Sequence, residues 1–399
     1  MENFKQVFSR ILTKNFSYLM QIYDQNQIKQ IAAAIRRGEA VVLPTDTIYG
    51  LCASALNQKA VEKIYQLRRR DKNKPCIILI ADIAQLQNFK IKLTSDLKNL
   101  LSAIWPNRIS VVLRYQSKNF SYLHRQIKTL SFRVPNSKFI SRLLELTGPL
   151  IAPSANIQNR KPAKNLKEAQ RYFHDQVSYV DGGVIKGKPS SLIAFDKNFD
   201  LKILRAGATN GNHYYLMRHG EAISNAQDRL SSYPEKFRNP LTVRGQAQVT
   251  AQLRKIKNLT FHFIIASPLE RTKQTAKMVN QVLKLPLRFD LRLREMDFGV
   301  LNGQPTLAYQ SMFKNDPEKY LKAAPGGETR RQVKLRMLQV FFEIEKKHKR
   351  KNILIISHQD PIWVVAGASQ GLSEKETANK QNLIFNLAQL QRVKFLDIS

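Results

Sequence analysis

Apolar residues recur at helical spacing in several stretches of the first half of the chain. Residues 25–37 place apolar side chains on one face, and Gly38 ends the pattern. Short apolar runs separate these stretches, and such runs are typical of strands buried on both faces. The other expected helices are 58–68, 96–104, 140–146 and 165–174, and the expected strands are 40–43, 75–80, 109–113, 130–134, 150–153, 189–193 and 201–204. Their alternation predicts a mixed α/β domain.

A second α/β pattern begins just past the middle of the chain. The run Tyr214 to Met217 leads directly into Arg218-His219-Gly220-Glu221, which predicts a buried strand followed by a polar loop. Further strands are expected at 261–266 and 352–356. Helices are expected to open at Thr242, at Ser267 as an N-cap before Pro268, and near Pro361. In open α/β sheets ligands bind beyond the carboxyl ends of the strands, so we expect chemistry there.

The length of the chain also indicates two domains. At 399 residues it is too long for one ordinary core. The segment 208–212 is small, polar and typical of turns, which favours a linker between the halves. The predicted organisation is therefore an N-terminal extension over 1–20, a first domain over 21–208, a linker over 209–212 and a second domain over 213–399.

The charge is strongly positive, with 65 Lys and Arg against 30 Asp and Glu. Residues 1–209 carry 34 basic and 14 acidic side chains (34 − 14 = +20), which leaves 31 and 16 for the rest (31 − 16 = +15). An excess spread over both halves favours anionic partners such as nucleotides, phosphate esters or RNA. A lysine-rich surface that is simply solvated explains it equally well.

Other features of composition point to a cytoplasmic protein. Cys52 and Cys76 have neither metal-site spacing nor a disulfide framework, which suits a reducing compartment. No apolar run is long enough to span a membrane, so no membrane partner is expected. The first twenty residues lack the apolar core and cleavage site of a signal peptide.

Polar residues follow several expected strands of the first domain. Thr45 comes after the strand 40–43, and Ser154 and Asn156 come after 150–153. Arginines also follow strands, and arginine with hydroxyl side chains is suited to holding phosphates and carboxylates. The alternative for Thr45 is a local role, because threonine after a strand often caps the next turn.

The motifs of this half resemble the YrdC/TsaC family of L-threonylcarbamoyladenylate synthases. They are PTDTIYGL, a basic cluster before KP, WPNRISVVL, FRVP, PLIAPSAN, PSSLI and ILRAG, in that order over about residues 21–208. The resemblance implies a twisted, mixed α/β sheet around a basic cavity. It implies that L-threonine, bicarbonate and ATP, with Mg²⁺, give threonylcarbamoyl-AMP and pyrophosphate for the t6A modification of tRNA. Expected partners are tRNA or the tRNA threonylcarbamoyl-transfer proteins.

The same resemblance implies the binding residues of the synthase. They are Thr45 for threonine, and Arg68, Arg70, Arg133, Ser154, Asn156, Ser190 and Arg205 for nucleotide and threonine. Arg68 departs from the family, which usually has lysine there, and Gln158-Asn159 replaces a usual Ser-Gly. These departures leave a second hypothesis open, in which the domain is a non-catalytic nucleotide- or RNA-binding module of the YciO type.

In the second domain, four basic residues are expected at one edge of the sheet. Arg218 and His219 follow one strand, His358 follows another, and Arg271 lies in the first turn of a helix. If these strands are parallel neighbours, the four side chains converge on a pocket suited to phosphate. One neutral imidazole can attack phosphorus, while Glu295 is the candidate general acid and Asp297 the runner-up. Arginines around Glu295 would lower its pKa, so another influence must keep its proton available.

The motifs LMRHGEA, PLTVRGQAQ, ASPLERTKQTA, LREMDFGVLNGQ, PGGET and ISHQD resemble the histidine phosphatase (phosphoglycerate mutase-like) superfamily over about 213–399. The resemblance implies a three-layer α/β/α fold, His219 as phosphorylated nucleophile and Glu295 as proton donor. It also implies Asn225 and Glu328 as secondary pocket residues, and neither metal nor cofactor. LREMDFG favours a phosphatase acting on a small phosphate ester, with a phosphoglycerate mutase as the alternative. Gln359 and Asp360 replace usual small residues, which should alter the pocket rim.

Overall fold

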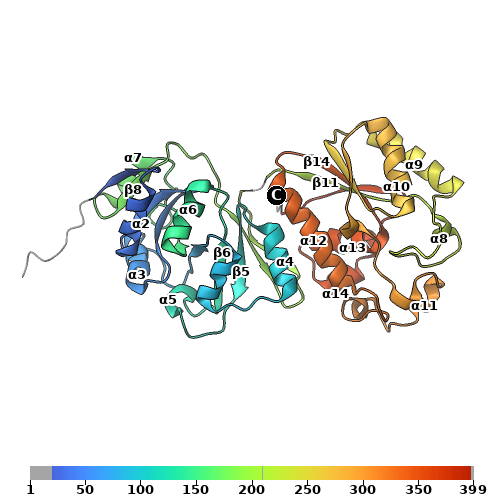
Figure 1. The fold of residues 1–399 in the computed structure, drawn as a ribbon, viewed down its shortest axis with the longest axis horizontal. Coiled ribbons are helices and arrows are strands. Elements are labelled where there is room, and N and C mark those ends of the chain that lie inside the picture. Colours follow the sequence, from blue (N-terminus) through green and yellow to red (C-terminus); the bar gives the residue numbers. More distant parts are fainter. Residues whose placement is uncertain (1–19, 209, 397–399) are drawn as a thin grey trace, which may run out of the picture. The chain divides into compact units, whose positions relative to one another are not determined.

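The structure, a computed structural model, describes residues 20–208 and 210–396, so the predicted N-terminal extension lies almost wholly outside it. Figure 1 shows an α/β chain in which helices flank sheets throughout. The described residues form two compact units. The first comprises 20–81, 115–130 and 137–188, and the second comprises 82–114, 131–136 and 189–396.

The first unit contains a mixed sheet. Its strands lie in the order β1 (Ile22–Asp24), β8 (Ser178–Asp181), β2 (Val41–Pro44), β3 (Tyr49–Ser54), β7 (Leu150–Ile151) and β4 (Ile77–Leu79). The first two pairings are parallel and the following three are antiparallel. The helices of this unit are α2 (Ile28–Arg36), α3 (Gln58–Leu67), α5 (Ser121–His124), α6 (Lys138–Thr147) and α7 (Leu166–Phe173). A core of apolar side chains from α2, α6 and the strands, Ile31 and Leu143 among them, is fully buried.

The second unit begins with segments that belong to the first half of the sequence. Strand β5 (Ile109–Arg114) pairs in parallel with β9 (Ser191–Phe195), which pairs in antiparallel with β10 (Leu201–Arg205). Helix α4 (Ser95–Ile104) belongs to the same unit, and β6 (Thr129–Arg133) ends in it. Strand β9 begins two residues later than the expected 189–193, because Pro189 has no N–H to donate to a ladder.

The second unit also holds a five-stranded sheet. Its order is β13 (Leu287–Phe289), β12 (Phe263–Ala266), β14 (Asn352–Ser357), β11 (His213–Arg218) and β15 (Leu390–Val393). Only β15 runs antiparallel to its neighbour. Arg218 pairs with Ser357, and Ala266 pairs with Ile356, so these three strands end at one edge. The parallel neighbours that the predicted convergence required are therefore present.

Helices cover this sheet on two sides. Helices α9 (Val243–Ile256) and α10 (Glu270–Leu283) pack together, as do α12 (Arg330–Lys347) and α13 (Gln359–Ser369). Figure 1 shows β11 and β14 running between these two pairs. Short helices α8 (Ile223–Ala226), α11 (Thr306–Gln310) and α14 (Glu374–Asn379) complete the fold. This is the predicted three-layer arrangement.

Two helix starts differ from the sequence prediction. Ser267 is not the N-cap of α10, which begins at Glu270 after Leu269. The Ser267 hydroxyl instead lies 2.8 Å from Nε2 of His358, so a contact across the sheet edge replaces the local cap. Helix α13 begins at Gln359 rather than near Pro361, with His358 as its N-cap residue. Both differences arise where side chains form the candidate site.

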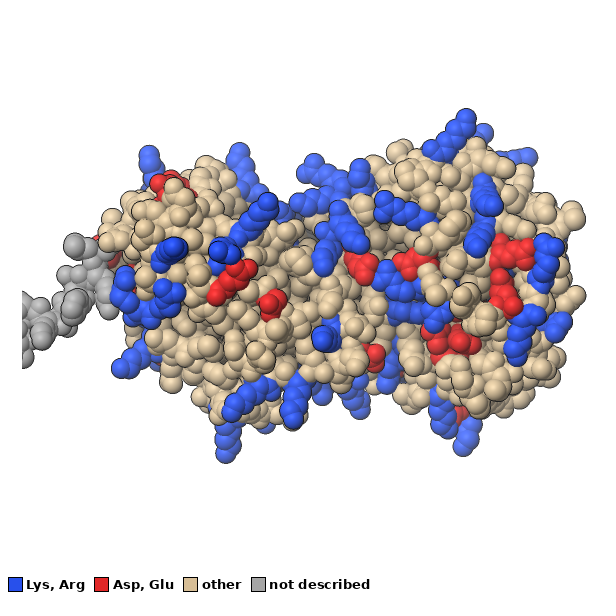
Figure 2. Space-filling view, viewed as in Figure 1, with Lys and Arg blue, Asp and Glu red and all other residues tan. Residues whose placement is uncertain are grey.

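Figure 2 shows Lys and Arg side chains scattered over the visible face rather than gathered in a single patch, as the even charge of the two sequence halves predicts. Within residues 20–208 and 210–396, no helix combines the length and apolar character needed to cross a membrane.

Candidate active site

Two histidines meet at the edge where β11 and β14 end. His219 is 2% exposed and His358 is fully buried, and their ring centroids lie 5.1 Å apart. His358 shares a 2.8 Å hydrogen bond with Ser267 through Nε2, while its Nδ1 is buried with no partner in the described part of the chain. The strand register thus brings together two imidazoles that are 139 positions apart in sequence (358 − 219).

The hydrogen bonds of His219 define its protonation state. Nδ1 lies 2.6 Å from the carbonyl oxygen of Gly220, and a carbonyl can only accept. Nε2 lies 3.1 Å from Nε of Arg271, which can only donate. The ring is therefore assigned as neutral, with the proton on Nδ1 and a lone pair on Nε2. Burial, reinforced by Arg271 and then Arg218, holds the pKa of His219 well below its usual value. Such an imidazole is a nucleophile at neutral pH.

Arg271 and Arg218 supply fixed positive charge beside that nitrogen. Arg271 lies in the first turn of α10 and is 2% exposed. Its Nη1 pairs with a Glu235 oxygen at 2.9 Å, and its Nη2 donates to the Ser231 carbonyl at 3.0 Å. Arg218 donates from Nη1 to the Phe385 carbonyl at 3.0 Å, and its Nε is buried without a partner among the described residues. A buried donor without a partner indicates a site for an anion.

Glu295 lies in the same pocket as a carboxyl group that holds a proton near neutrality. It is 8% exposed, and one oxygen accepts a 2.8 Å hydrogen bond from the Met296 N–H. Burial, followed by the negative charge of Asp360, raises its pKa to about 7, and Arg271 opposes that rise. The sequence predicted that nearby arginines tend to lower this pKa and that another influence must keep the proton available. Burial is that influence, because it outweighs the arginines.

These groups line one cavity of about 180 Å³. Arg218, His219, Arg271, Glu295 and Asn225 all contribute to its wall. Gln359 and Asp360, the two residues that depart from the family pattern, also line it. His358 and Glu328 are not among its lining residues.

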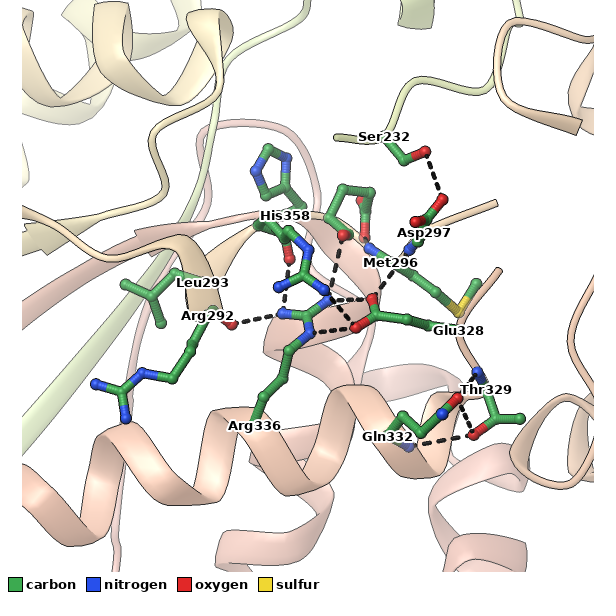
Figure 3. A network of polar contacts seen from close by, with 12 residues as sticks. Ser232, Arg292, Leu293, Met296, Asp297, Glu328, Thr329, Gln332, Arg336 and His358 are labelled. Atoms are coloured by element: carbon green, nitrogen blue, oxygen red, sulfur yellow. Dashed lines mark hydrogen bonds and ion pairs between the residues drawn. The ribbon is translucent and has the colours of Figure 1, made fainter. Parts of the chain in front are cut away.

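Glu328 instead supports the loop that carries Glu295. Its carboxylate pairs with Arg336 at 2.9 Å and with Arg294 at 2.7 Å, and it accepts from the Asp297 N–H at 3.1 Å. Arg336 donates in turn to the backbone carbonyls of Arg294 and Glu295 at 2.9 and 3.2 Å. Figure 3 shows the Arg336 side chain rising from its helix to reach Glu328 on one side and Arg292 on the other. Glu328 thus supports the loop that carries Glu295.

Asp297, the second candidate for the acid, has a local structural role. Its carboxylate accepts from the Gly299 N–H at 2.9 Å and lies 3.4 Å from the Ser232 hydroxyl. Gly299 has a φ of +55°, and an added Cβ would approach the Pro325 carbonyl, so this turn requires glycine. Asp297 is not among the cavity-lining residues, whereas Glu295 is.

Sequence reasoning missed the groups that hold the arginines. Ser231 and Glu235 bind Arg271, and Arg330 binds Asp360 at 2.8 Å. Helix α12, which carries Arg330 and Arg336, was not predicted at all. Its signal was readable, because Thr329 and Gln332 form a capping box before an apolar run.

In the first unit, Arg68 joins two of the predicted synthase residues. It follows α3, is 3% exposed, and donates to the Ser154 hydroxyl and the Asn156 side-chain oxygen at 3.1 Å each. Its Nε also donates to the Asn156 carbonyl at 3.0 Å. Nη1 is buried with no partner in the described residues. Burial, followed by the charge of Arg70, lowers the pKa of Arg68 to about 10, so it remains charged.

Thr45 and Arg70 are occupied by local contacts. The Thr45 hydroxyl donates to the Ile48 carbonyl at 2.6 Å and accepts from the Thr47 and Ile48 N–H groups. This is the turn-capping arrangement that stood as the alternative for Thr45. Arg70 donates to the carbonyls of Lys74 and Pro75 at 3.0 and 2.9 Å.

The remaining predicted synthase residues lie in the second unit. Arg205 donates to the Ser190 carbonyl at 2.8 Å, and the Ser190 hydroxyl lies 2.9 Å from that of Ser110. Arg133 ends β6 and is 4% exposed. Ser110 was not predicted, because a serine within an apolar strand resembles an ordinary core position.

Across residues 20–208 and 210–396, no group of three or more His, Cys, Asp and Glu side chains is arranged to hold a metal ion.

The comparisons with known proteins define the class of each half. The Sua5/YciO/YrdC family model, whose description is "Telomere recombination", matches residues 33–207. The model of the histidine phosphatase superfamily (branch 1) matches residues 214–396. The chain thus carries a Sua5/YrdC domain followed by a histidine phosphatase domain, and both resemblances drawn from the motifs are confirmed.

Individual curated relatives are threonylcarbamoyl-AMP synthases. The chain is 34% identical to a threonylcarbamoyl-AMP synthase of Bacillus subtilis over 171 residues, which are 42% of this chain and 47% of that protein. It is 28% identical to a threonylcarbamoyl-AMP synthase of Pseudomonas putida over 170 residues, 43% of this chain and 92% of that protein. The chain thus spans about half the length of the first of these relatives. A solved structure of Bacillus stearothermophilus YhfR is 22% identical, with a TM-score of 0.41, over 45% of this chain and 90% of that chain.

Proposed function

We propose that the chain is a bifunctional enzyme, and that its histidine phosphatase domain hydrolyses a small phosphate ester through a phosphohistidine. The observation that supports this most directly is the state of His219. Its Nδ1 is bound to the Gly220 carbonyl, which leaves the Nε2 lone pair facing Arg271 in a cavity. A neutral, fixed imidazole beside guanidinium groups is suited to attack on phosphorus.

The proposed reaction has two steps. Nε2 of His219 forms a bond to phosphorus as the bond to the ester oxygen breaks, and Glu295 transfers its proton to that oxygen. Arg218 and Arg271 stabilise the charge that develops on the phosphoryl oxygens. In the second step Glu295, now ionised, takes a proton from water, whose oxygen attacks phosphorus and releases phosphate and free His219. Residues Arg218, His219, Arg271, Glu295 and His358 are the proposed catalytic set, with Asn225 binding substrate.

For the first domain we propose L-threonylcarbamoyladenylate synthesis from L-threonine, bicarbonate and ATP, with Mg²⁺ entering on the nucleotide. The names of the relatives support this activity. The uncommitted Nη1 of buried Arg68, beside Ser154 and Asn156, supports an anion site there. The product would serve the t6A modification of tRNA. The other proposed binding residues are Thr45, Arg70, Arg133, Ser190 and Arg205.

A trapping experiment tests the phosphatase. Protein mixed with a labelled phosphate ester and quenched in alkaline denaturant should carry one acid-labile, base-stable phosphoryl group on wild type and none on His219→Gln. Phosphate release from p-nitrophenyl phosphate should vanish in the same variant. A stable phosphoryl group transferred to a second acceptor rather than to water would identify a mutase instead.

The synthase is tested in the His219→Gln background, so that the second domain cannot consume products. Conversion of ATP to pyrophosphate should require both threonine and bicarbonate. Salt-sensitive tRNA binding without such turnover would establish the alternative, a nucleotide- or RNA-binding module.

A further inference from the structure

A second carboxylate, that of Asp360, lines the phosphate cavity and is not used by the proposed reaction. It lies in the first turn of α13, two residues after His358. Its side chain is 14% exposed, and Oδ1 accepts a 2.8 Å hydrogen bond from Nε of Arg330. No other hydrogen bond to this carboxylate occurs in the described part of the chain. It therefore keeps acceptor capacity at the wall of the cavity.

The cations beside Asp360 are already paired with carboxylates. Nη1 of Arg330 lies 3.1 Å from an oxygen of Asp316, and the same oxygen lies 2.7 Å from the Lys319 ammonium group. The Arg330 guanidinium also stacks 4.3 Å from the ring centre of Trp363. The charges of Arg330 and Lys319 are thus balanced by two carboxylates, while Arg229, which also lines the cavity, donates to the Gly303 carbonyl. The region beside Asp360 therefore offers an anion less positive charge than the number of lining cations indicates.

Arg218 and Arg271 line the same cavity beside His219, and they provide the charge that a phosphoryl group requires. A substrate that places its phosphoryl group beside His219 directs its leaving group toward Glu295, because that acid must protonate the ester oxygen. Asp360 lines the same cavity, and its negative charge contributes to the raised pKa values of both Glu295 and Tyr309. The leaving group therefore shares the cavity with the Asp360 carboxylate.

We propose that Asp360 determines substrate specificity: its carboxylate accepts a hydrogen bond from a hydroxyl or ammonium group on the leaving group, and it excludes esters with a second anion next to the phosphate. The proposal rests on the proposed phosphatase function of the same site. It assigns the substrate class as phosphate monoesters of alcohols that carry hydroxyl or amine donors. Asp360 would distinguish between esters in two ways. Its negative charge repels an anionic leaving group, and its partly buried oxygen pairs with a hydroxyl or ammonium donor on a preferred one.

Three esters that differ in one group test the proposal. Hydroxyethyl phosphate carries a hydroxyl, ethanolamine phosphate carries an ammonium, and phosphoglycolate carries a carboxylate at the matching position. Wild type should hydrolyse the first two with a kcat/KM at least about ten-fold above that for phosphoglycolate. Asp360→Asn keeps an acceptor oxygen for Arg330 but removes the charge, so it should reduce that preference by about ten-fold.

Asp316→Asn is the matched control, because Asp316 pairs with the same arginine but is not among the lining residues. Its side chain is 45% exposed, and it should leave the preference within about two-fold of wild type. An equal shift in both variants would mean that Asp360 acts only by holding Arg330, and it would overturn the proposal. So would an unchanged preference in Asp360→Asn. Failure of wild type to hydrolyse any ester, p-nitrophenyl phosphate included, would overturn the phosphatase function itself.

Discussion

The candidate phosphate pocket and the candidate synthase residues differ in how their polar groups are used. Around His219, the arginines are held by Ser231, Glu235 and the Phe385 carbonyl, and they still direct donors toward a cavity. In the first unit, by contrast, Thr45 and Arg70 are bound to nearby backbone carbonyls. Arg68, in contrast to Thr45 and Arg70, combines deep burial with an uncommitted donor.

The contrast shows two ways to prepare a binding site. Fixed donors that already face a cavity can stabilise charge without rearranging, which is the condition for electrostatic catalysis. Side chains that are hydrogen-bonded to their own loop must break those hydrogen bonds before they can bind a ligand. A ligand that bound to such side chains would therefore require the loop to rearrange. The pocket in the second unit is of the first kind, and the Thr45 turn is of the second kind.

The largest expected effect comes from removing the nucleophile. His219→Gln should lower kcat for any phosphate ester on the order of 10⁴-fold or more, because neither arginine can replace the Nε2 lone pair. Steady-state phosphate release measures this loss. Threonine-dependent ATP turnover should be unchanged in the same protein, and its loss would contradict the independence of the two activities.

Arg68→Ala should have the next largest effect, on the first domain. It removes a buried, uncommitted donor and takes the Arg68 hydrogen bonds away from the Ser154 hydroxyl and the Asn156 side-chain oxygen, so threonine-dependent ATP turnover should fall by about 100-fold. Arg68→Lys restores the charge but not three fixed donors, and should recover about a tenth of the activity. Pyrophosphate release measures both. The control is Lys59→Ala, an exposed position on α3, and thermal unfolding identifies any loss of fold.

The pH dependence should reveal Glu295 as the general acid. Its pKa is raised to about 7 and its protonated form is the active one, so kcat/KM should decline as pH rises through 7, by about ten-fold per unit above it. The lowered pKa of His219 keeps that ring neutral well below pH 6.5, so it should not limit activity near neutrality. An alkyl phosphate should show the decline. p-Nitrophenyl phosphate, whose leaving group needs no proton, should show it weakly, and an equal decline with both esters would contradict the assignment.

The sequence allowed much of the second domain to be predicted, because its chemistry lies at strand ends. One apolar run ends in Arg218-His219 and another ends before His358, so the sequence predicted that the histidines would meet if the two strands were parallel neighbours. The structure supplies that pairing, and its register brings the two histidines together. Arg271 was placed in a first helical turn, although the helix starts later than its Ser-Pro sequence indicates. Strand ends and helix starts depend on the nearby residues, so they can be predicted from local sequence patterns.

Tertiary effects were not predictable in the same way. The proton on Glu295 depends on burial and on Asp360, which is 65 positions away (360 − 295), so the local arginines in the sequence indicated the wrong direction for its pKa. Ser267 resembles an N-cap but is bound to His358. The bonds that occupy Thr45 and Arg70 depend on turn geometry, which composition does not specify. Helix α12 is buried on several faces despite its charges, and this obscured its amphipathic pattern.

The smallest expected effect concerns Glu328, which the motifs predicted to be a pocket residue. Its bonds to Arg336, Arg294 and the Asp297 N–H instead give it a supporting role. Glu328→Gln should lower the free energy of unfolding by about 2 kcal/mol, because Arg336 loses its buried counter-charge. Urea unfolding measures this, and kcat should fall by less than about ten-fold with KM little changed.

A double-mutant cycle makes this prediction sharper. Arg336→Met removes the partner, and the double variant should be less destabilised than the sum of the two single variants, because the pair acts as a unit. Arg294→Met is the matched comparison, since Arg294 is more exposed and binds the same carboxylate. A raised KM without loss of stability in Glu328→Gln would instead mean that Glu328 reaches the substrate. In that case the loop that carries Glu295 would have to move when the ester binds. The phosphatase site would then rearrange on binding as the Thr45 turn must, and the contrast between the two halves of the chain would be lost.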